Sequence, residues 1–85
     1  MYTFIDTIEN LAFLNKELLK KPYLGIDTEF RRTTKDNMKL ALLQVNDGEE
    51  IFLIDCLLIK NPREHASFLL SDSVTKIFHS CKEDL

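Results

Sequence analysis

The sequence contains little that would mark a membrane, secreted or strongly basic protein. Only 2 Gly and 2 Pro interrupt its 85 residues, and 45% of them are hydrophobic, so the chain is expected to pack rather than to stay disordered. Positive charge is not in excess, because the formal net charge is −3. This excludes a basic footprint over the whole molecule, and any grip on nucleic acid must come from a local patch.

Residues 1–21 also lack a targeting signal. The stretch MYTFIDTIENLAFLNKELLKK has no basic leader, and acids interrupt its apolar residues, which excludes a secretion signal and a membrane span. Cys56 and Cys81 form neither a CxxC pair nor a metal-type cluster and are interpreted as small buried hydrophobic side chains. We therefore expect one small, soluble domain of the reducing cytoplasm, with no membrane partner.

The order of apolar runs and turn signals predicts an α/β fold. Asp6 and Glu9 supply a capping box for a helix over about 7–20, and Asp47-Gly48 predicts the turn of an antiparallel hairpin. A second helix over 62–71 would begin at Asn61 and Pro62 and bury Ala66, Phe68, Leu69 and Leu70. The predicted strands are 2–5, an antiparallel set at 23–30, 38–46 and 50–55, and a parallel strand at 75–79 beside 23–30.

Two acids stand inside an otherwise apolar strand, LGIDTEF at 24–30. Asp27 and Glu29 are two positions apart, which places both carboxylates on one face of the strand, about 6–7 Å from each other. Asp84 lies just beyond the parallel strand 75–79, so three carboxylates are expected to converge where the two strands end. Such oxygen ligands suit Mg²⁺ or Mn²⁺, and a bound cation would relieve the repulsion of Asp27 and Glu29.

Four segments in this order, DTEF, LALLQV, IFLIDCLLI and KIFHSCKEDL, resemble the ribonuclease D group of 3′–5′ exonucleases in the DEDD superfamily. The resemblance runs over almost the whole length and implies a ribonuclease H-like mixed sheet and two-metal hydrolysis of RNA from its 3′ end, with single-stranded DNA as a further substrate to consider. It makes Asp27, Glu29 and Asp84 metal ligands. The family's third motif, a further Asp and a Tyr or His, has no match here. The capping box of Ser80 and Glu83 likewise predicts a helix for which only one turn of chain remains. We therefore expect residues 1–85 to form the N-terminal portion of the domain and to be inactive alone.

Each of these residues also has a simpler interpretation. The acids of LGIDTEF would be a solvated strand end, and Asp84 would be favoured by a helix N-terminus whatever the function. A basic loop after the acids is placed to receive a nucleic-acid backbone, but a solvated loop explains it equally well; its residues are Arg31, Arg32, Lys35 and Lys39. Phe30 would stack on a terminal base or pack partly against the core, whereas His79 and Gln44 are interpreted as structural.

A rival hypothesis makes the chain a non-catalytic remnant. It would act as a small binding module that self-associates over core surface left uncovered. The coding sequence after Leu85 separates the two hypotheses: a helix followed by a Tyr-x-x-x-Asp-like segment favours the exonuclease, and a stop codon with stable expression favours the remnant.

Overall fold

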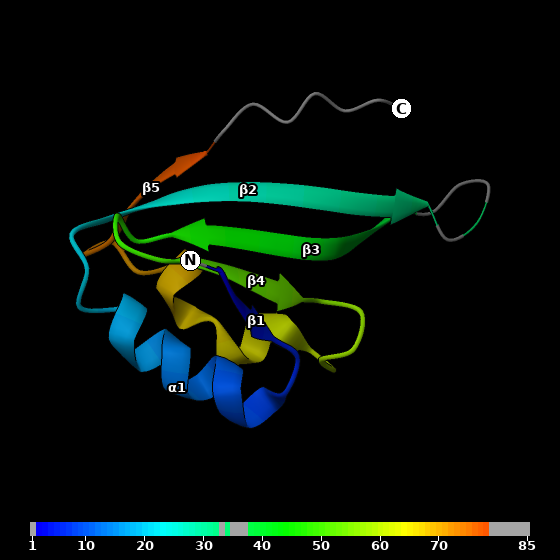
Figure 1. Ribbon diagram of the computed structural model, residues 1–85. Helices are drawn as coiled ribbons and strands as arrows, with labels where there is room; N and C mark the ends of the chain where they lie inside the picture. The colour runs from blue at the N-terminus through cyan, green and yellow to red at the C-terminus, as the bar shows by residue number, and fades with distance from the viewer. Residues whose placement is uncertain (1, 33, 35–37, 79–85) are drawn as a thin grey trace.

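Five strands form one mixed sheet with neighbours in the order β1–β4–β3–β2–β5 (Figure 1). The computed structural model describes residues 2–32, 34 and 38–78. Both β2–β3 and β3–β4 are antiparallel, whereas β1–β4 and β2–β5 are parallel. The predicted mixed sheet and its parallel last strand are therefore confirmed. The strands are β1 (Tyr2–Ile5), β2 (Tyr23–Arg32), β3 (Met38–Asn46), β4 (Ile51–Asp55) and β5 (Thr75–Phe78).

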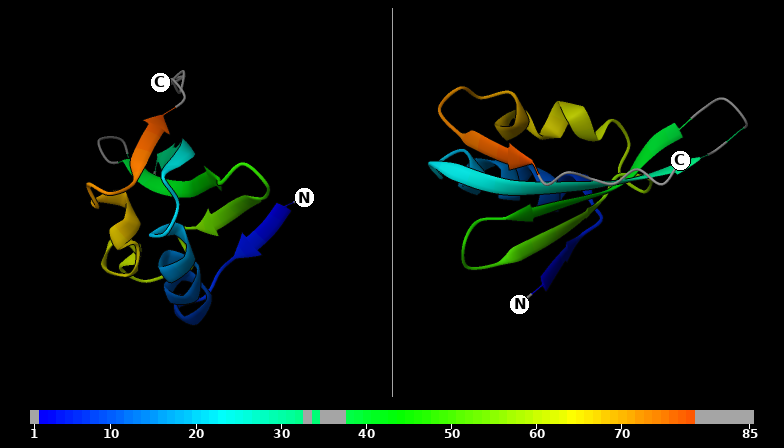
Figure 2. Two further views of the ribbon diagram at one scale, coloured as in Figure 1. Left: turned by 90° about the vertical axis from the view of Figure 1, so that its left-hand side faces the viewer. Right: turned by 90° about the horizontal axis from the view of Figure 1, so that it is seen from above.

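All helical segments among the described residues lie on one side of this sheet, as both views in Figure 2 show. They are the helix α1 (Ile8–Leu18) and two short 3-10 turns, η1 (Pro62–His65) and η2 (Ser67–Leu69). The core lies between them and the sheet and is built from Ile5, Leu11, Leu14, Leu18, Leu24, Ile26, Leu43, Val45, Ile54, Ile59, Ala66, Phe68 and Val74. We call this side of the sheet the helix-side face and the other side the open face. No helix in the described ranges is long and apolar enough to cross a membrane.

The first helix forms as predicted but with a different cap. Leu11, Leu14 and Leu18 recur at three- and four-residue steps and are buried against the sheet. The N-cap is Thr7 rather than Asp6, because the Thr7 hydroxyl accepts a hydrogen bond from the backbone N–H of Asn10 at 3.1 Å. The regular helix ends at Leu18, two residues before the predicted end.

The predicted helix over 62–71 is wrong, since the chain forms two separate 3-10 turns there. Ala66 breaks the helix with φ −130° and ψ 55°, and Asn61 takes φ 51° without a capping hydrogen bond from its side chain. The Asn15 side chain of α1 then accepts a bond from the backbone N–H of Phe68 and donates one to the Ser67 hydroxyl, both at 2.9 Å. Phe68 is thereby held in the core, whereas Leu70, expected inside, is 79% exposed.

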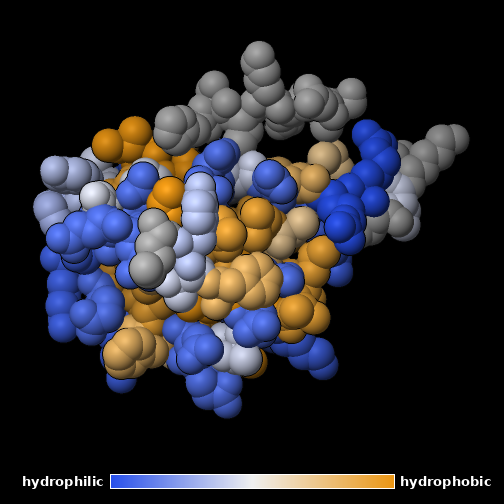
Figure 3. Space-filling model, viewed as in Figure 1, coloured by the Kyte–Doolittle hydropathy of each residue, from blue (hydrophilic) through white to orange (hydrophobic). Residues whose placement is uncertain are grey.

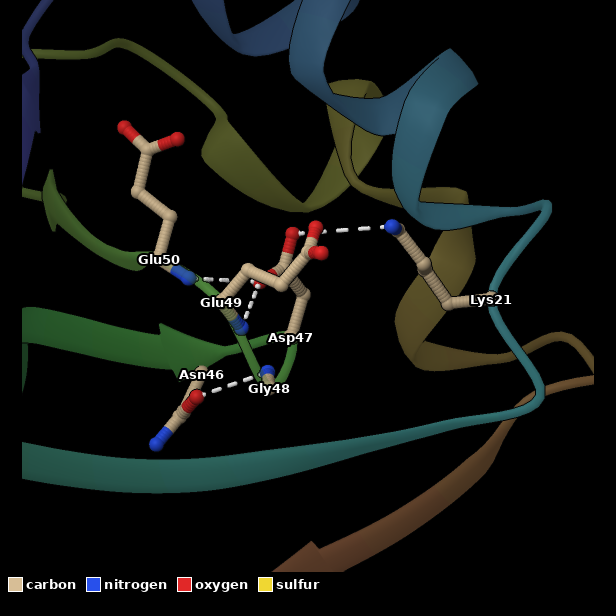
Figure 4. Close-up of polar contacts among 6 residues, drawn as sticks. All are labelled: Lys21, Asn46, Asp47, Gly48, Glu49 and Glu50. Atoms are coloured by element: carbon tan, nitrogen blue, oxygen red, sulfur yellow. Dashed lines mark hydrogen bonds and ion pairs between the residues drawn. The ribbon is translucent and has the colours of Figure 1, made fainter.

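The hairpin turn between β3 and β4 is built around Asp47 (Figure 4). Asp47 Oδ1 accepts hydrogen bonds from the backbone N–H groups of Glu49 and Glu50, and Gly48 takes the positive φ of 99° that the turn needs. Lys21, just after α1, pairs with Asp47 at 3.8 Å. Partial burial alone would raise the pKa of Asp47, but these hydrogen bonds and the Lys21 charge outweigh it and lower the pKa below its ordinary value.

This lowered pKa makes the fold sensitive to acid. A carboxyl group with a lower pKa in the folded state stabilises the fold above its ordinary pKa, and this contribution disappears as the pH falls through the folded-state value. We expect Asp47→Ala to cost about 1–2 kcal/mol at pH 7. Asp47→Asn keeps an acceptor oxygen and should cost less. Urea unfolding at pH 7, 5 and 2.5 should show that the difference in unfolding free energy between the parent and each variant shrinks toward acid pH. A difference for Asp47→Asn that stays constant with pH would contradict the role of the charge.

The two bonds of Asn15 predict a second effect. Asn15→Ala leaves the Phe68 N–H without its partner and should lower stability by about 1–2 kcal/mol. For a domain of this size, that corresponds to a melting temperature roughly 4–16 °C lower. Asn10→Ala, on the exposed side of the same helix, is the control and should change stability by no more than about 0.5 kcal/mol. Equal melting temperatures for the two variants would show that the Asn15 contact contributes nothing.

Candidate metal centre

The two predicted acids lie on the open face of β2. Leu24 and Ile26 are fully buried on the helix-side face, so the alternation of the strand turns Asp27 and Glu29 the other way. Asp27 is half-buried and Glu29 is exposed. The prediction that one face of one strand carries both carboxylates is therefore confirmed.

The acids follow directly after the stretch of β2 for which the structure describes pairing with β5. The parallel register runs from Tyr23 beside Thr75 to Ile26 beside Phe78, and β2 then continues to Arg32. Asp27 is thus the first residue of β2 past the described part of this pairing, near the carboxyl end of β5. Asp84 and His79 lie outside the described residues, so the third ligand stays a prediction.

On their other side the acids face β3. Asp27 is in register with Gln44, and Glu29 with Leu42. Gln44 is half-buried, and in-register partners share a face, so its amide lies next to the Asp27 side chain on the open face. The sequence alone indicates only a structural role for Gln44. The Asp-Gly turn sets only the register of β3 with β4, in which Gln44 is opposite Leu53, so that turn could not have placed Gln44 beside Asp27.

Beyond the acids, the antiparallel pair of β2 and β3 carries basic side chains. We call this part of the β2–β3 hairpin the basic ribbon. The register shifts between Glu29 and Phe30, where Ala41 is the extra residue of β3, and pairing then continues with Arg31 beside Lys39. The loop predicted from Arg31 onward is therefore wrong for Arg31 and Arg32, since pairing to β3 keeps both in the strand. In the orientation of Figure 1, Figure 3 shows apolar side chains over the middle of the sheet and a strongly hydrophilic surface at the end of β2.

The predicted nucleic-acid residues do not all share a face. Arg31 follows the alternation of Asp27 and Glu29 onto the open face, whereas Phe30 belongs to the row of Leu24 and Ile26. Phe30 is 52% exposed, which agrees with partial packing. Lys35 lies outside the described residues.

The donor set of the acids fits a hard divalent cation. Mg²⁺ in proteins is held by one or two carboxylates together with phosphate oxygens of a substrate, and Asp27 and Glu29 supply two carboxylates on one surface. No cluster of three or more His, Cys, Asp or Glu side chains suited to a metal occurs in the described part of the chain. A closed metal cage is therefore not formed by the described residues, and the pair needs oxygen atoms from elsewhere.

Known proteins match this chain over nearly its whole length. Residues 2–85 match the family model for 3′–5′ exonucleases. Ribonuclease D of Pseudomonas paraeruginosa is 40% identical over 76 residues, which are 89% of this chain and 20% of that protein. The chain spans about a fifth of the length of the curated relatives it matches.

Solved structures show the same likeness. The crystal structure of Escherichia coli RNase D, an exoribonuclease involved in structured RNA processing, is similar with a TM-score of 0.80 and 36% identity, over 94% of this chain and 21% of that one. Trypanosoma brucei RNase D in complex with RNA U12 gives a TM-score of 0.74 and 27% identity, over 98% of this chain and 31% of that one.

A cation held by the two acids should stabilise the fold. At ten times its dissociation constant it adds about 1.4 kcal/mol. Because we expect weak, near-millimolar binding, about 10 mM Mn²⁺ should raise the melting temperature by roughly 6–11 °C. Asp27→Asn should abolish this rise, whereas Asp72→Asn, exposed before β5, should keep it. An equal rise in the parent and in Asp27→Asn would rule out the metal site.

Proposed function

Because this chain belongs to the 3′–5′ exonuclease family, we propose that it carries part of a site that hydrolyses RNA from the 3′ end by two-metal catalysis. The observation that carries the proposal is the placement of Asp27 and Glu29 on one face of β2, directly after the part of β2 that the described residues pair with β5. Carboxylates at the ends of parallel strands are well placed to meet a phosphodiester that enters from outside the sheet.

RNA is the proposed substrate because a related protein has been solved with RNA bound. Trypanosoma brucei RNase D, 27% identical to this chain, has been solved in complex with RNA U12. In this chain Arg31 lies on the same face of β2 as the acids, two residues beyond Glu29 and opposite Lys39. These two cations would hold RNA phosphates and thereby position the terminal phosphodiester at Asp27 and Glu29.

The acids have distinct tasks in this proposal. Asp27 and Glu29 would hold Mg²⁺ or Mn²⁺, with Asp84 as the proposed third ligand. Bound ions of this type lower the pKa of the attacking water and stabilise the leaving oxygen. The Gln44 amide beside Asp27 would orient its carboxylate. Hydrolysis places the water oxygen on phosphorus and releases a nucleoside monophosphate and an RNA one nucleotide shorter.

These 85 residues alone should be poor catalysts. The resemblance implies that the complete site also needs a further Asp and a water-orienting Tyr or His, and residues 1–85 contain no match to that motif. A missing general acid–base group costs about 10² to 10⁴ in rate. The alternative, a non-catalytic binding module, is favoured by the apolar side chains exposed on the open face, among them Phe4 at 54% and Ile77 at 56%.

A hydrolysis assay tests the proposal. With Mn²⁺ and a 5′-labelled single-stranded RNA, the chain should shorten RNA at least about 100-fold more slowly than Escherichia coli RNase D. Mn²⁺ should increase its RNA affinity, and Asp27→Asn should remove that increase, while Asp72→Asn should not. Hydrolysis as fast as that of the relative would contradict the proposed inactivity. RNA affinity that is insensitive to Mn²⁺ and to Asp27→Asn would favour the binding module.

A further inference from the structure

A cavity of about 950 Å³ opens on the helix-side face, away from the acids. It lies between β3, β4, α1 and the segment that leads into η1. Its floor is apolar and is formed by Leu11, Leu40, Leu43, Ile54 and Leu69. Cys56 also lines it; burial, and then the charge of Asp55, raise the pKa of this thiol, so Cys56 stays neutral. The cavity therefore offers an apolar surface that is large enough for one planar ring system.

The rim of this cavity is basic. Lys39, Lys60 and Arg63 line it together with a single acid, Glu64. Within the described ranges, none of these three cations forms an ion pair. Asn61 also lines the cavity, and its side-chain amide makes no hydrogen bond to any described residue. The rim thus carries uncompensated positive charge and an amide able to recognise a polar edge.

The loop that carries Lys60 and Arg63 is held in place by its own contacts. Asp55 Oδ1 accepts hydrogen bonds from the backbone N–H groups of Leu57 and Leu58, both at 3.0 Å. Ile59, immediately before Lys60, is buried in the core. Pro62 then begins η1, so both cations flank a short segment with few conformations open to it.

Lys39 joins this rim to the basic ribbon of the hairpin. It lines the cavity and is in register with Arg31, which stands two residues past Glu29 on β2. Arg31, Lys39, Lys60 and Arg63 therefore form a basic region that passes from Arg31 on the open face to the cavity on the helix-side face. The remainder of the chain compensates for this region, which is how a net charge of −3 coexists with a local basic track.

We propose that the cavity binds one upstream nucleotide of a single-stranded RNA whose 3′ end lies at Asp27 and Glu29. The base enters the apolar recess, its edge meets the Asn61 amide, and the flanking phosphates contact Lys39, Lys60 and Arg63. This inference rests on the proposed function for the position of the 3′ end. An uncharged apolar ligand would make no use of the cations on the rim. Because Lys39 connects the rim to Arg31, a polyanion that reaches both the cavity and Arg31 is favoured.

The first test is RNA binding without metal. In EDTA, fluorescence anisotropy follows a 5′-labelled 12-nucleotide oligouridine, so neither hydrolysis nor cation binding contributes. Lys60→Gln/Arg63→Gln should weaken binding about tenfold and lower the slope of log affinity against log salt by about 1.4, for two lost phosphate contacts at 0.7 each. Lys16→Gln/Lys20→Gln, on exposed positions in α1 and just after it, removes the same charge and should weaken binding less than twofold.

A second measurement needs no variant. One abasic nucleotide is moved along the oligouridine, and the largest loss of affinity should occur at a single position inside the strand, because only one base enters the recess. The inference would be overturned by an equal loss of affinity at every abasic position. Equal weakening of binding by the two double variants, or no RNA binding by the parent, would also overturn it. Asp27→Asn should strengthen binding in EDTA slightly, because it removes a charge that repels the RNA phosphates when no metal is bound. If the Mn²⁺ and hydrolysis tests fail while Lys60→Gln/Arg63→Gln still weakens RNA binding, only the proposed function is contradicted.

Discussion

The alternation of side chains along β2 is the constraint on which the rest of this molecule depends. Leu24 and Ile26 are fully buried on the helix-side face, and this fixes which residues of the strand point to the open face. A slip of one residue would move Asp27 into the core, where an unpaired carboxylate costs several kcal/mol. The apolar half of β2 therefore determines the orientation of its polar half. Among the described residues the strand is paired on both sides at Gly25 and Ile26, and from Asp27 onward it pairs only with β3.

The antiparallel pair of β2 and β3 carries acidic and basic side chains at successive positions along its length. Acids come first, at Asp27 and Glu29, and cations follow at Arg31 and, across the ribbon, at Lys39. A polyanion held by the cations would be repelled by the acids unless a divalent cation compensates them, so metal and nucleic acid are expected to support each other's binding. This arrangement gives an acidic chain a local basic surface, and the register shift at Ala41 lies at the boundary between the acidic and basic parts.

Residues 62–71 illustrate why local patterns were insufficient. Pro62 and the apolar residues after it fit a helix, and on propensity alone that prediction was reasonable. The competing interactions come from residues about fifty positions away, because Asn15 of α1 bonds Phe68 and Ser67 and Phe68 fills the core. These contacts are satisfied only if the chain turns at Ala66, and tertiary packing then outweighs helix propensity. The cap of α1 differs by one residue for a smaller reason, since Asp6 and Thr7 are both good caps and only backbone geometry selects between them.

The sequence by itself determined the strands, the Asp-Gly hairpin and the single face shared by Asp27 and Glu29, because alternation and turn chemistry act over a few neighbouring residues. The family was likewise recognisable from short segments in order. Only the tertiary structure decided that Gln44 stands beside Asp27 and that Lys39, Lys60 and Arg63 surround one cavity. These outcomes depend on strand register and on how the loop between β4 and η1 folds over the sheet. Both result from burying the common core rather than from any local signal.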